Sequence, residues 1–550
     1  METPYGEIPD RFVPNMRPVE MHDYLRRSQT RRSVLKGAGA VGLAAALSPV
    51  LWRQSDSFAS TPDTPQWIAY GTDPATQMHV SWSTGTATGT RQVPPNPQVR
   101  WGKNTRYGAQ QAATNSGPVP VPSTVPGEPA ENTIYNNTLL VGLHPDSTYH
   151  YSVSNDGKTW SADATFRTAV AKTSDFRFTA FGDHGTHSTS TAPMAALVAN
   201  LRPAFCVVSG DLSYATPLPI PIPQTARFHP EAWDTFLGII GPSAAQSIPW
   251  QVGVGTHEIE PLENHGYDGF LTRFPQPYDL TSGSPVVHTF TYGNVAFIQL
   301  DGNDLSAQAT QINGYSQGAQ TRWLEDKLAT YRRQDSGIDF IVVTFGNCVF
   351  STNQNHGSDG GIRAVWEPLF DRYEVDLVIN GHVHAYERTN PMRAGQPTTK
   401  VAPGGTVYPA QQGTTYICAG GAGQGLYRTW YGTTDSPAGD TGDPTPPKVW
   451  QWSDGDGPAG GSGTNLDVTD TAEGFSAFRR AHWHCLVIDV TAPHGHGRSS
   501  GHGAETSMHI RAIDPAQTMT AITDITQPAT MDSVTLVRET QRHQPDHPRP

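Results

Sequence analysis

The sequence is poor in charge and in cysteine. Charged residues make up 16% of its 550 positions, and it contains four cysteines. These lie far apart without a Cys-x-x-Cys pair, so a zinc site built on cysteine is not indicated. Three of them lie in apolar runs typical of strands, which favours buried free thiols, although an exported chain could also form disulfides. The four are Cys206, Cys348, Cys418 and Cys485.

Other absences exclude two kinds of protein. No Gly-X-Y repeat runs through the chain, so it is not collagen-like. No basic stripe interleaved with aromatic residues is present and the net charge is -13, so we expect no nucleic acid partner. Glycine, with 54 residues, and proline, with 46, are abundant, and this composition favours turn-rich β structure over long helices.

Residues 1–59 are typical of an export signal. Arg31 and Arg32 precede an apolar, Gly- and Ala-rich run over 37–52, and the pairing resembles a Tat-type signal peptide with a long leading segment. Small residues predict cleavage after Ala59, and the exported protein would reach the cell envelope or the extracellular space. A buried Ala/Gly helix with a chance arginine pair is the alternative. No later stretch is long and apolar enough to span a bilayer, so no stable membrane anchor is expected.

Residues 66–170 predict an all-β domain. Short alternating strands are separated there by clusters of Gly, Pro and Asn. Tyr149, Tyr151 and Val153 lie on one face of one such strand, and the segment resembles a fibronectin type III sandwich with its tyrosine-corner strand. We assign no chemistry to this domain.

Residues 173–515 predict an α/β domain, in which apolar strands alternate with loops and helices. The nearly continuous apolar run over 338–343 is typical of a strand buried on both faces and covered by helices. Two closing strands are predicted at 482–491 and 507–513. The final residues, 541–550, are predicted to be disordered.

Four short motifs with metal-ligand side chains each follow an apolar, strand-like run. They are Gly182-Asp183, Gly210-Asp211, Gly255-Thr256-His257-Glu258 and Gly381-His382-Val383-His384. Carboxylates and imidazoles from several strand ends can together hold two cations that clamp a phosphoryl group. Any one motif alone is weak evidence, because an Asp at a strand end often only forms a turn. All four in this order predict a metal-dependent phosphoryl-transfer site.

Tyr214, three residues after Asp211, indicates which kind of metal-dependent phosphoryl-transfer site this is. With this tyrosine the set resembles the purple acid phosphatases of the calcineurin-like metallophosphoesterase superfamily. The resemblance implies an all-β fibronectin type III-like sandwich followed by an α/β metallophosphoesterase domain of two β-sheets packed together and flanked by helices. It also implies an acid phosphatase that hydrolyses phosphate monoesters with a metal-bound hydroxide.

The resemblance assigns a ferric ion to four side chains: Asp183, Asp211, Tyr214 and His384. Asp211 would also bridge to a second divalent ion, Zn, Fe or Mn, and His382 would bind that ion too. Through the same resemblance, two histidines become candidate catalytic residues. These are His257, which would contact the substrate, and His356, which would face the leaving group.

Two positions depart from the family pattern, and both belong to the second ion. Thr256 stands where the family has an asparagine and is at most a weak ligand, whereas Gly346 stands where the family has a histidine. Placing the missing ligand at Asn347 instead would spoil the spacing of ten residues from Gly346 to His356. Whether His184, Asn347 or water substitutes stays open. Restoring Asn and His at the two departing positions is expected to strengthen the second site.

Two further hypotheses remain. The missing ligands motivate the first, a phosphate- or ligand-binding protein on the same scaffold with little turnover. The other is a phosphodiesterase, which would differ only in the shape of its cleft. Small phosphate esters are the expected partners, and the sequence leaves the natural substrate and the oligomeric state open.

Overall fold

The computed structural model describes most of the chain after residue 63. The described ranges are 64–119, 131–186, 190–216, 228–260, 264–308, 312–432, 443, 445–452, 465–472, 474–492, 505–515 and 529–539, with two short strands near the N-terminus. The chain divides into two compact units, Met1–Phe58 and Ala59–Pro550. In the first unit, β1 (Glu2–Thr3) pairs with β2 (Gly6–Glu7). The rest of the predicted signal peptide and the predicted tail at 541–550 lie outside the described residues.

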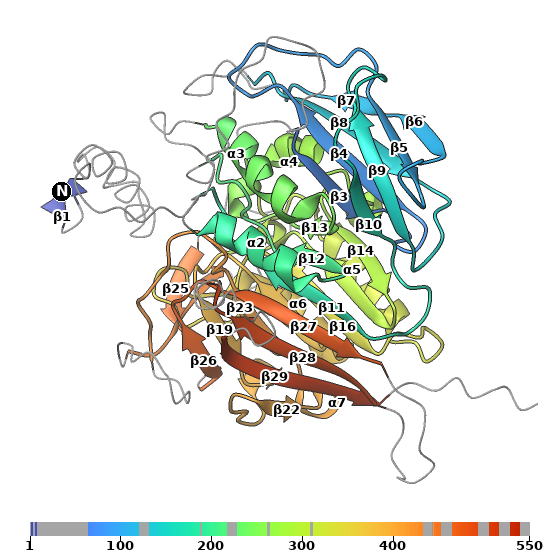
Figure 1. Cartoon of the computed structure of the whole chain (residues 1–550). Helices are drawn as coiled ribbons and strands as arrows, with labels where there is room; N and C mark the ends of the chain where they lie inside the picture. The colour runs from blue at the N-terminus through green and yellow to red at the C-terminus, as the bar shows by residue number, and fades with distance from the viewer. Residues whose placement is uncertain are drawn as a thin grey trace, which may run out of the picture. The chain divides into compact units, whose positions relative to one another are not determined.

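Two four-stranded antiparallel sheets form the N-terminal domain of the second unit (Figure 1). Their strand orders are β3-β4-β8-β7 and β10-β9-β5-β6. The strands are β3 (Gln66–Tyr70), β4 (Met78–Thr84), β5 (Gln98–Gly102), β6 (Ala109–Ala112), β7 (Thr114–Ser116), β8 (Ile134–Leu140), β9 (Thr148–Ser154) and β10 (Ala164–Arg167). In β9 the Tyr149 hydroxyl accepts a hydrogen bond of 2.9 Å from the His144 backbone N–H, which is the tyrosine-corner contact of such sandwiches.

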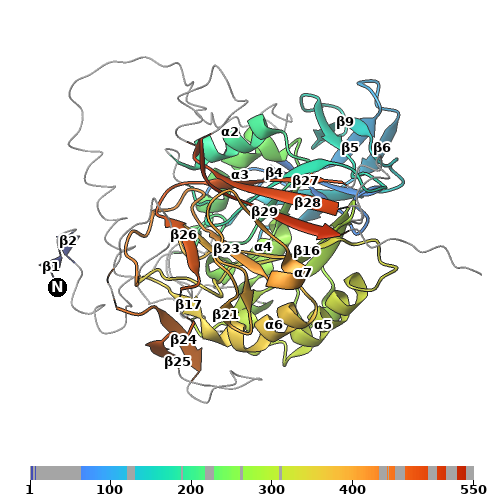
Figure 2. The same ribbon diagram turned by 90° about the horizontal axis from the view of Figure 1, so that it is seen from below.

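Two seven-stranded sheets form the second domain (Figure 2). The first, in spatial order, contains β13 (Trp250–Val252), β12 (Phe205–Val208), β11 (Phe176–Phe181), β27 (Cys485–Thr491), β28 (Glu505–Ile513), β29 (Thr530–Glu539) and β22 (Gly405–Val407). The second contains β14 (His288–Tyr292), β15 (Val295–Gln299), β16 (Phe340–Phe345), β18 (Leu377–Asn380), β23 (Thr415–Ala419), β19 (Tyr386–Thr389) and β26 (Ser476–Arg480). Strands β11, β12 and β13 run parallel, as do β15, β16, β18 and β23.

The remaining elements are helices and short strands. The helices are α2 (Thr191–Leu201), α3 (Glu231–Ile240), α4 (Asp268–Arg273), α5 (Ala319–Tyr331), α6 (Gly360–Arg372) and α7 (Pro409–Gln412), with short turns η2 (Gly241–Ala245), η3 (Thr256–Glu258), η4 (Asn264–Gly266), η5 (Leu280–Ser282) and η6 (Gly302–Asp304). The short strands are β17 (Ser358–Asp359), β20 (Met392–Arg393), β21 (Gln396–Pro397), β24 (Lys448–Trp452) and β25 (Asn465–Thr469). Among the described residues, no helix has both the length and the hydropathy needed to cross a membrane.

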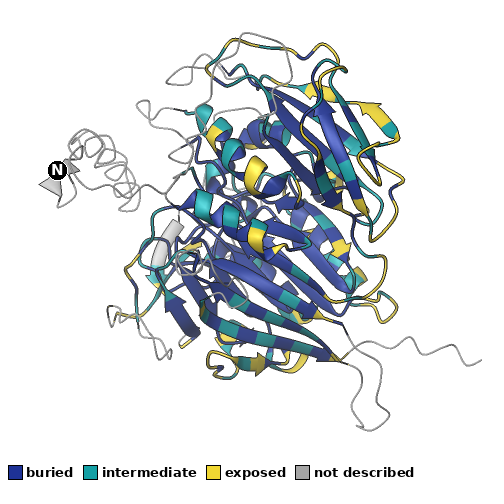
Figure 3. Cartoon of the chain, in the orientation of Figure 1, coloured by how far each residue is buried: buried dark blue, intermediate teal, exposed yellow. Residues whose placement is uncertain are grey.

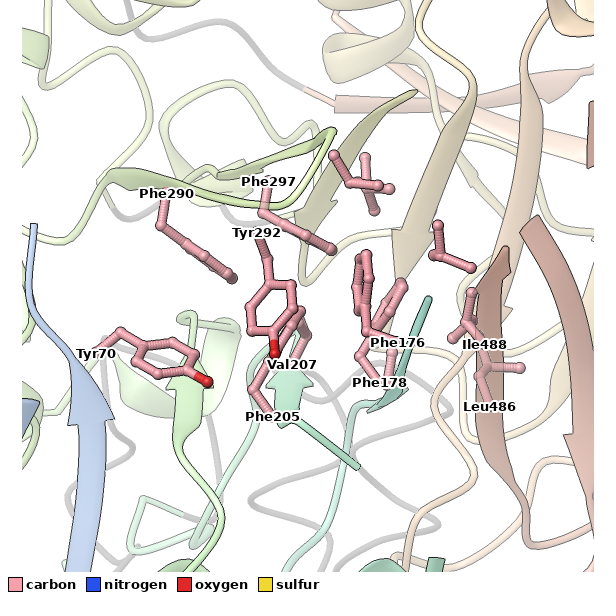
Figure 4. Close-up of a cluster of buried hydrophobic side chains, with 14 of the residues drawn as sticks. Tyr70, Phe176, Phe178, Phe205, Val207, Phe290, Tyr292, Phe297, Leu486 and Ile488 are labelled. Atoms are coloured by element: carbon pink, nitrogen blue, oxygen red, sulfur yellow. The ribbon is translucent and has the colours of Figure 1, made fainter. Parts of the chain in front are cut away.

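Aromatic side chains fill the space between the two seven-stranded sheets (Figure 4). Phe178 and Phe205 of the first sheet stack with ring centroids 5.3 Å apart. Phe297 of the second sheet meets Phe178 edge-on at 5.0 Å. This shared core fixes the two sheets face to face, as expected for apolar strands buried on both sides.

Strand β16 shows how one apolar run serves two layers. Phe340 and Val342 point into the core between the sheets, whereas Ile341 and Val343 pack with side chains of α5 and α6 on the other face. Every residue of β16 is buried, and dark blue burial runs through the central strands in Figure 3. The structure therefore confirms the predicted fold class, an all-β sandwich followed by packed sheets flanked by helices.

One strand lies beyond residue 515, where the sequence prediction ended the domain. Strand β29 pairs antiparallel with β28, and its other edge pairs parallel with β22. Inside the domain, Asp532 of β29 forms an ion pair with Arg388, with 2.6 Å between Nε and Oδ2. Both side chains are fully buried, so β29 is an integral part of the first sheet.

Candidate metal centre

The predicted ligands lie at strand ends that the topology brings together. Asp183 follows β11 and Asp211 follows β12, which is the parallel neighbour of β11. His382 and His384 follow β18 of the other sheet. The backbone N–H of His382 donates to Asp183 Oδ2 at 2.7 Å, which connects the two sheets at this point.

Four of these residues hold their backbones in the left-handed region. The angle φ is 60° at Asp183, 55° at Asp211, 58° at Tyr214 and 68° at His382. Residues other than glycine rarely adopt this region, and each instance costs about 1–3 kcal/mol. Such strain concentrates at functional sites, where the surrounding structure holds a side chain in a required position.

Three side chains converge closely enough to share one ion. The Tyr214 hydroxyl lies 3.0 Å from Asp183 Oδ1 and 3.0 Å from His384 Nε2. His384 Nε2 lies 3.3 Å from the same Asp183 oxygen. Two donors bound at right angles about 2.1 Å from one ion are about 3.0 Å apart, so the three atoms have the spacing of adjacent ligands. Carboxylate, phenolate and imidazole together suit a ferric ion.

Asp211 is held in place by the turn η3. The buried Glu258 carboxylate accepts hydrogen bonds from the backbone N–H groups of Asp211, Leu212 and Gly255 at 2.7, 2.8 and 2.8 Å. The backbone N–H of His257 donates to Asp211 Oδ1 at 2.7 Å. Glu258 belongs to one of the sequence motifs, but only the structure shows that it accepts the backbone hydrogen bonds that hold Asp211 in place.

Electrostatics at the centre favour a bound cation. Burial and the neighbouring charge of Asp211 raise the pKa of Asp183 well above its usual value. Burial and the charge of Asp183 likewise raise the pKa of Tyr214. Burial alone would raise the pKa of Asp211 as well, but the electrostatic interactions of its carboxylate with His257 and His382 outweigh burial and lower that pKa. A cation would compensate the negative charges that burial penalises here.

The loop after β23 orients His384. The ring Nδ1 of His384 lies 2.8 Å from the Gly425 carbonyl oxygen, so Nδ1 carries the proton and Nε2 is the unprotonated nitrogen that can bind an ion. Tyr427 stacks on the His384 ring with centroids 4.2 Å apart and an interplanar angle of 8°. Its backbone N–H also donates to the His384 carbonyl at 3.0 Å. Neither Gly425 nor Tyr427 was predictable from the sequence, because neither belongs to a recognisable motif.

The other three histidines surround this centre. The His257 ring lies 4.1 Å from the Tyr214 ring, and its Nδ1 lies 2.7 Å from the Thr216 carbonyl oxygen. The His356 ring lies 3.8 Å from the His382 ring. His382 Nδ1 is 3.9 Å from Asp211 Oδ2, and its buried Nε2 has no hydrogen-bond partner among the described residues. The structure thus gathers every histidine that the sequence singled out as ligand or catalytic residue.

The two departing positions do not provide a second set of ligands. Gly346 follows β16 and has no side chain to donate. A Cβ at this position would lie 2.9 Å from the Gly255 Cα and 3.3 Å from the Val254 carbonyl oxygen, so a larger residue requires the backbone to move. Thr256 is buried as the first residue of η3. Restoring a histidine at residue 346 would therefore require the end of β16 and the loop after β13 to move apart.

The two candidate substitutes, His184 and Asn347, make other contacts in the structure. His184 packs edge-on against Phe236 and Trp250, at centroid distances of 5.3 and 6.1 Å, in the layer outside the first sheet. The Asn347 side-chain amide donates to the Ser306 hydroxyl at 3.0 Å, and its buried Oδ1 has no hydrogen-bond partner among the described residues. In the part of the chain that the structure describes, no three His, Cys, Asp or Glu side chains are grouped to hold an ion, so Tyr214 is needed to complete the first site. Of the ligands that the family implies for the second ion, this chain keeps Asp211 and His382.

Comparison with known proteins agrees with this architecture. The model of the purple acid phosphatase N-terminal domain matches residues 65–168, and the model of calcineurin-like phosphoesterases matches residues 176–386. An uncharacterized protein of Mycobacterium tuberculosis is 32% identical over 427 residues, which cover 70% of this chain and 75% of that protein. Purple acid phosphatase 23 of Arabidopsis thaliana is 26% identical over 358 residues, covering 60% of this chain and 75% of that one.

A solved structure supports the fold. The purple acid phosphatase isolated from yellow lupin (Lupinus luteus) seeds has a TM-score of 0.59 at 16% identity, covering 86% of this chain and 74% of that chain. The family-level resemblance drawn from the motifs is confirmed, and the family is one that uses a dinuclear metal centre. The chain belongs to the purple acid phosphatase family of calcineurin-like metallophosphoesterases and is a phosphoester hydrolase.

Proposed function

We propose that the protein hydrolyses phosphate monoesters with an iron ion held chiefly by Asp183, Tyr214 and His384, and with Asp211 beside them. The observation that carries the proposal is the position of the Tyr214 hydroxyl, 3.0 Å from both an aspartate oxygen and an imidazole nitrogen. A ferric ion held there would supply Lewis-acid activation of water and neutralise phosphoryl charge. A phenolate on ferric iron also absorbs visible light, so ligand identity can be read from a spectrum.

The histidines around this centre would bind and orient the ester. His257 donates its Nδ1 proton to the Thr216 carbonyl, which fixes its tautomer and makes Nε2 the ring nitrogen that can contact the ester. The His356 ring lies 3.8 Å from the His382 ring, and its Nδ1 lies 3.3 Å from the Gln308 side-chain oxygen. In that position His356 can deliver a proton to the leaving oxygen of the ester.

The test is turnover of p-nitrophenyl phosphate with iron quantified in the same sample. Tyr214→Phe removes the hydroxyl and should lose both the visible band and most of the activity. Tyr408→Phe, at an exposed tyrosine, is the matched control and should keep both. A Tyr214→Phe variant that retains the wild-type band and rate would refute the proposal. Faster turnover of bis(p-nitrophenyl) phosphate than of the monoester would instead favour a phosphodiesterase.

We also propose that the chain is exported through the Tat pathway. The support is the sequence alone: Arg31 and Arg32 precede the apolar run over 37–52. Replacing both arginines by lysine should retain the unprocessed precursor in the cytoplasm, whereas the unaltered chain should appear outside it, shortened by cleavage after Ala59. Equal export of both forms would contradict this route.

A further inference from the structure

The region expected to hold the second ion contains too few donors. The ligands implied by the family are an asparagine, two histidines and the bridging aspartate. This chain provides His382 and Asp211 there, with 3.9 Å between Nδ1 and Oδ2, and places Thr256 and Gly346 at the other two positions. Tight metal sites in proteins use at least three protein ligands, and one carboxylate with one imidazole falls short of that number.

Close packing also fills the space that the missing histidine would need. Gly346 lies against Gly255, since a Cβ on Gly346 would stand 2.9 Å from the Gly255 Cα. Gly255 in turn lies against Asp211, since its own Cβ would stand 2.4 Å from Asp211 Oδ1. The Gly381 backbone N–H also donates to the Gly346 carbonyl at 2.8 Å. The strand ends are therefore fixed to one another by close backbone contacts, which leave little room for a side chain at residue 346.

His382 is consequently available for a different role. Its side chain is buried, with an exposed fraction of 7%, and Nε2 has no hydrogen-bond partner among the described residues. An unpartnered buried polar atom is costly unless a ligand satisfies it. The His356 ring lies 3.8 Å away, so two imidazoles stand side by side next to the first ion site.

We propose that this chain is a single-ion phosphoesterase. One ion is held at Asp183, Tyr214 and His384, and His382 with His356 contacts the phosphoryl oxygens that a second ion would otherwise bind. The inference rests on the proposed function for the identity of the substrate, but the number of ions per chain can be measured without turnover. A single ion would differ from the dinuclear centre of the family, and the difference would follow from Thr256 and Gly346 of this chain.

The experiment counts ions in the purified mature protein after incubation with excess iron and zinc and removal of unbound metal. Elemental analysis should give about one ion per chain, and electron paramagnetic resonance should show an isolated ferric ion rather than an exchange-coupled pair. His382→Ala should keep the ion and the visible band while lowering kcat/KM about 100-fold, the effect of removing one preorganised phosphoryl contact. His382→Asn, which restores a donor, should recover part of the loss. His384→Ala should lose the ion.

The outcomes separate this inference from the proposed function. Two ions per chain would overturn it, and loss of one of the two in His356→Ala would show that His356 has taken the vacated ligand position. Loss of the only ion in His382→Ala would also overturn it, because His382 would then be a ligand of that ion. Two ions with full phosphatase activity would leave the proposed function standing. One ion without any turnover would support the single-ion site and refute the proposed function.

Discussion

Replacing Gly346 by alanine tests whether the close packing of Gly346 against Gly255 leaves no room for a side chain near the second ion site. The added Cβ would stand 2.9 Å from the Gly255 Cα, whereas carbon atoms in contact are about 3.5–4.0 Å apart. The backbone must therefore separate by about 0.6–1.1 Å, and overpacking of this size costs about 1–3 kcal/mol. We expect Gly346→Ala to lower the free energy of unfolding in urea by that amount. Gly346→His, alone or with Thr256→Asn, should cost more and should gain no second ion.

Gly253→Ala is the matched control for this prediction. Gly253 lies at the end of β13, and its added Cβ would stand 3.3 Å from the Gln299 amide nitrogen and 3.4 Å from the Val208 carbonyl oxygen. These contacts need only a small adjustment, so the control should lose clearly less stability. The reasoning is refuted if Gly346→Ala is as stable as the parent protein, or if Gly346→His with Thr256→Asn binds two ions and accelerates turnover.

Three further predictions concern groups around the site and away from it. Glu258→Ala leaves three buried backbone N–H groups without their acceptor, so it should lower the free energy of unfolding in urea by about 3 kcal/mol or more. Glu258→Gln keeps one acceptor oxygen and should lose less stability. Equal losses in the two variants would contradict the role of Glu258 as the acceptor that holds Asp211. Tyr427→Ala removes the ring stacked on His384 and should weaken iron binding about 10–100-fold in competition with a chelator, whereas Tyr427→Phe should retain it. Burial raises the pKa of Glu260 to about 7 despite the attraction of Arg273. The folded chain holds this proton more tightly than the unfolded chain, so the contribution is largest below the unfolded pKa and falls, by about 3 kcal/mol at most, as pH rises to about 7. Glu260→Gln should flatten that part of the stability profile, and an unchanged slope would show that another group titrates.

Strong apolar runs made the catalytic fold predictable. The run over 338–343 was expected to be buried on both faces, and β16 (Phe340–Phe345) is buried along its whole length. Strand β29 was missed because its pattern is mixed. Its buried positions include Asp532 and Arg538 together with Val534 and Leu536, so charge interrupts the alternation that marks a strand. Those charges are paired with residues from distant segments, and a sequence pattern cannot anticipate such partners.

The residues of the candidate site likewise fall into a group that the sequence predicted and a group that it did not. Asp183, Tyr214 and His384 were identifiable because each is a metal-type side chain in a motif at a strand end. Gly425 and Tyr427 were not, since one acts through a backbone carbonyl and the other through the face of its ring. Residues that orient a ligand in these ways need only the right backbone path, and a single sequence does not reveal that path.

Gly346 shows why a missing ligand means more in the structure than in the sequence. In the sequence, a glycine at a histidine position lowers the number of donors by one, and substitution would appear to restore it. In the structure, the glycine permits the end of β16 to approach the loop after β13, where Gly255 is pressed in turn against Asp211. A side chain at residue 346 would have to move that loop and would disturb the Glu258 contacts that hold Asp211. The glycine at residue 346 therefore involves both sheets, because it follows β16 of one sheet and packs against the loop after β13 of the other. Restoring a histidine there requires both loops to change together.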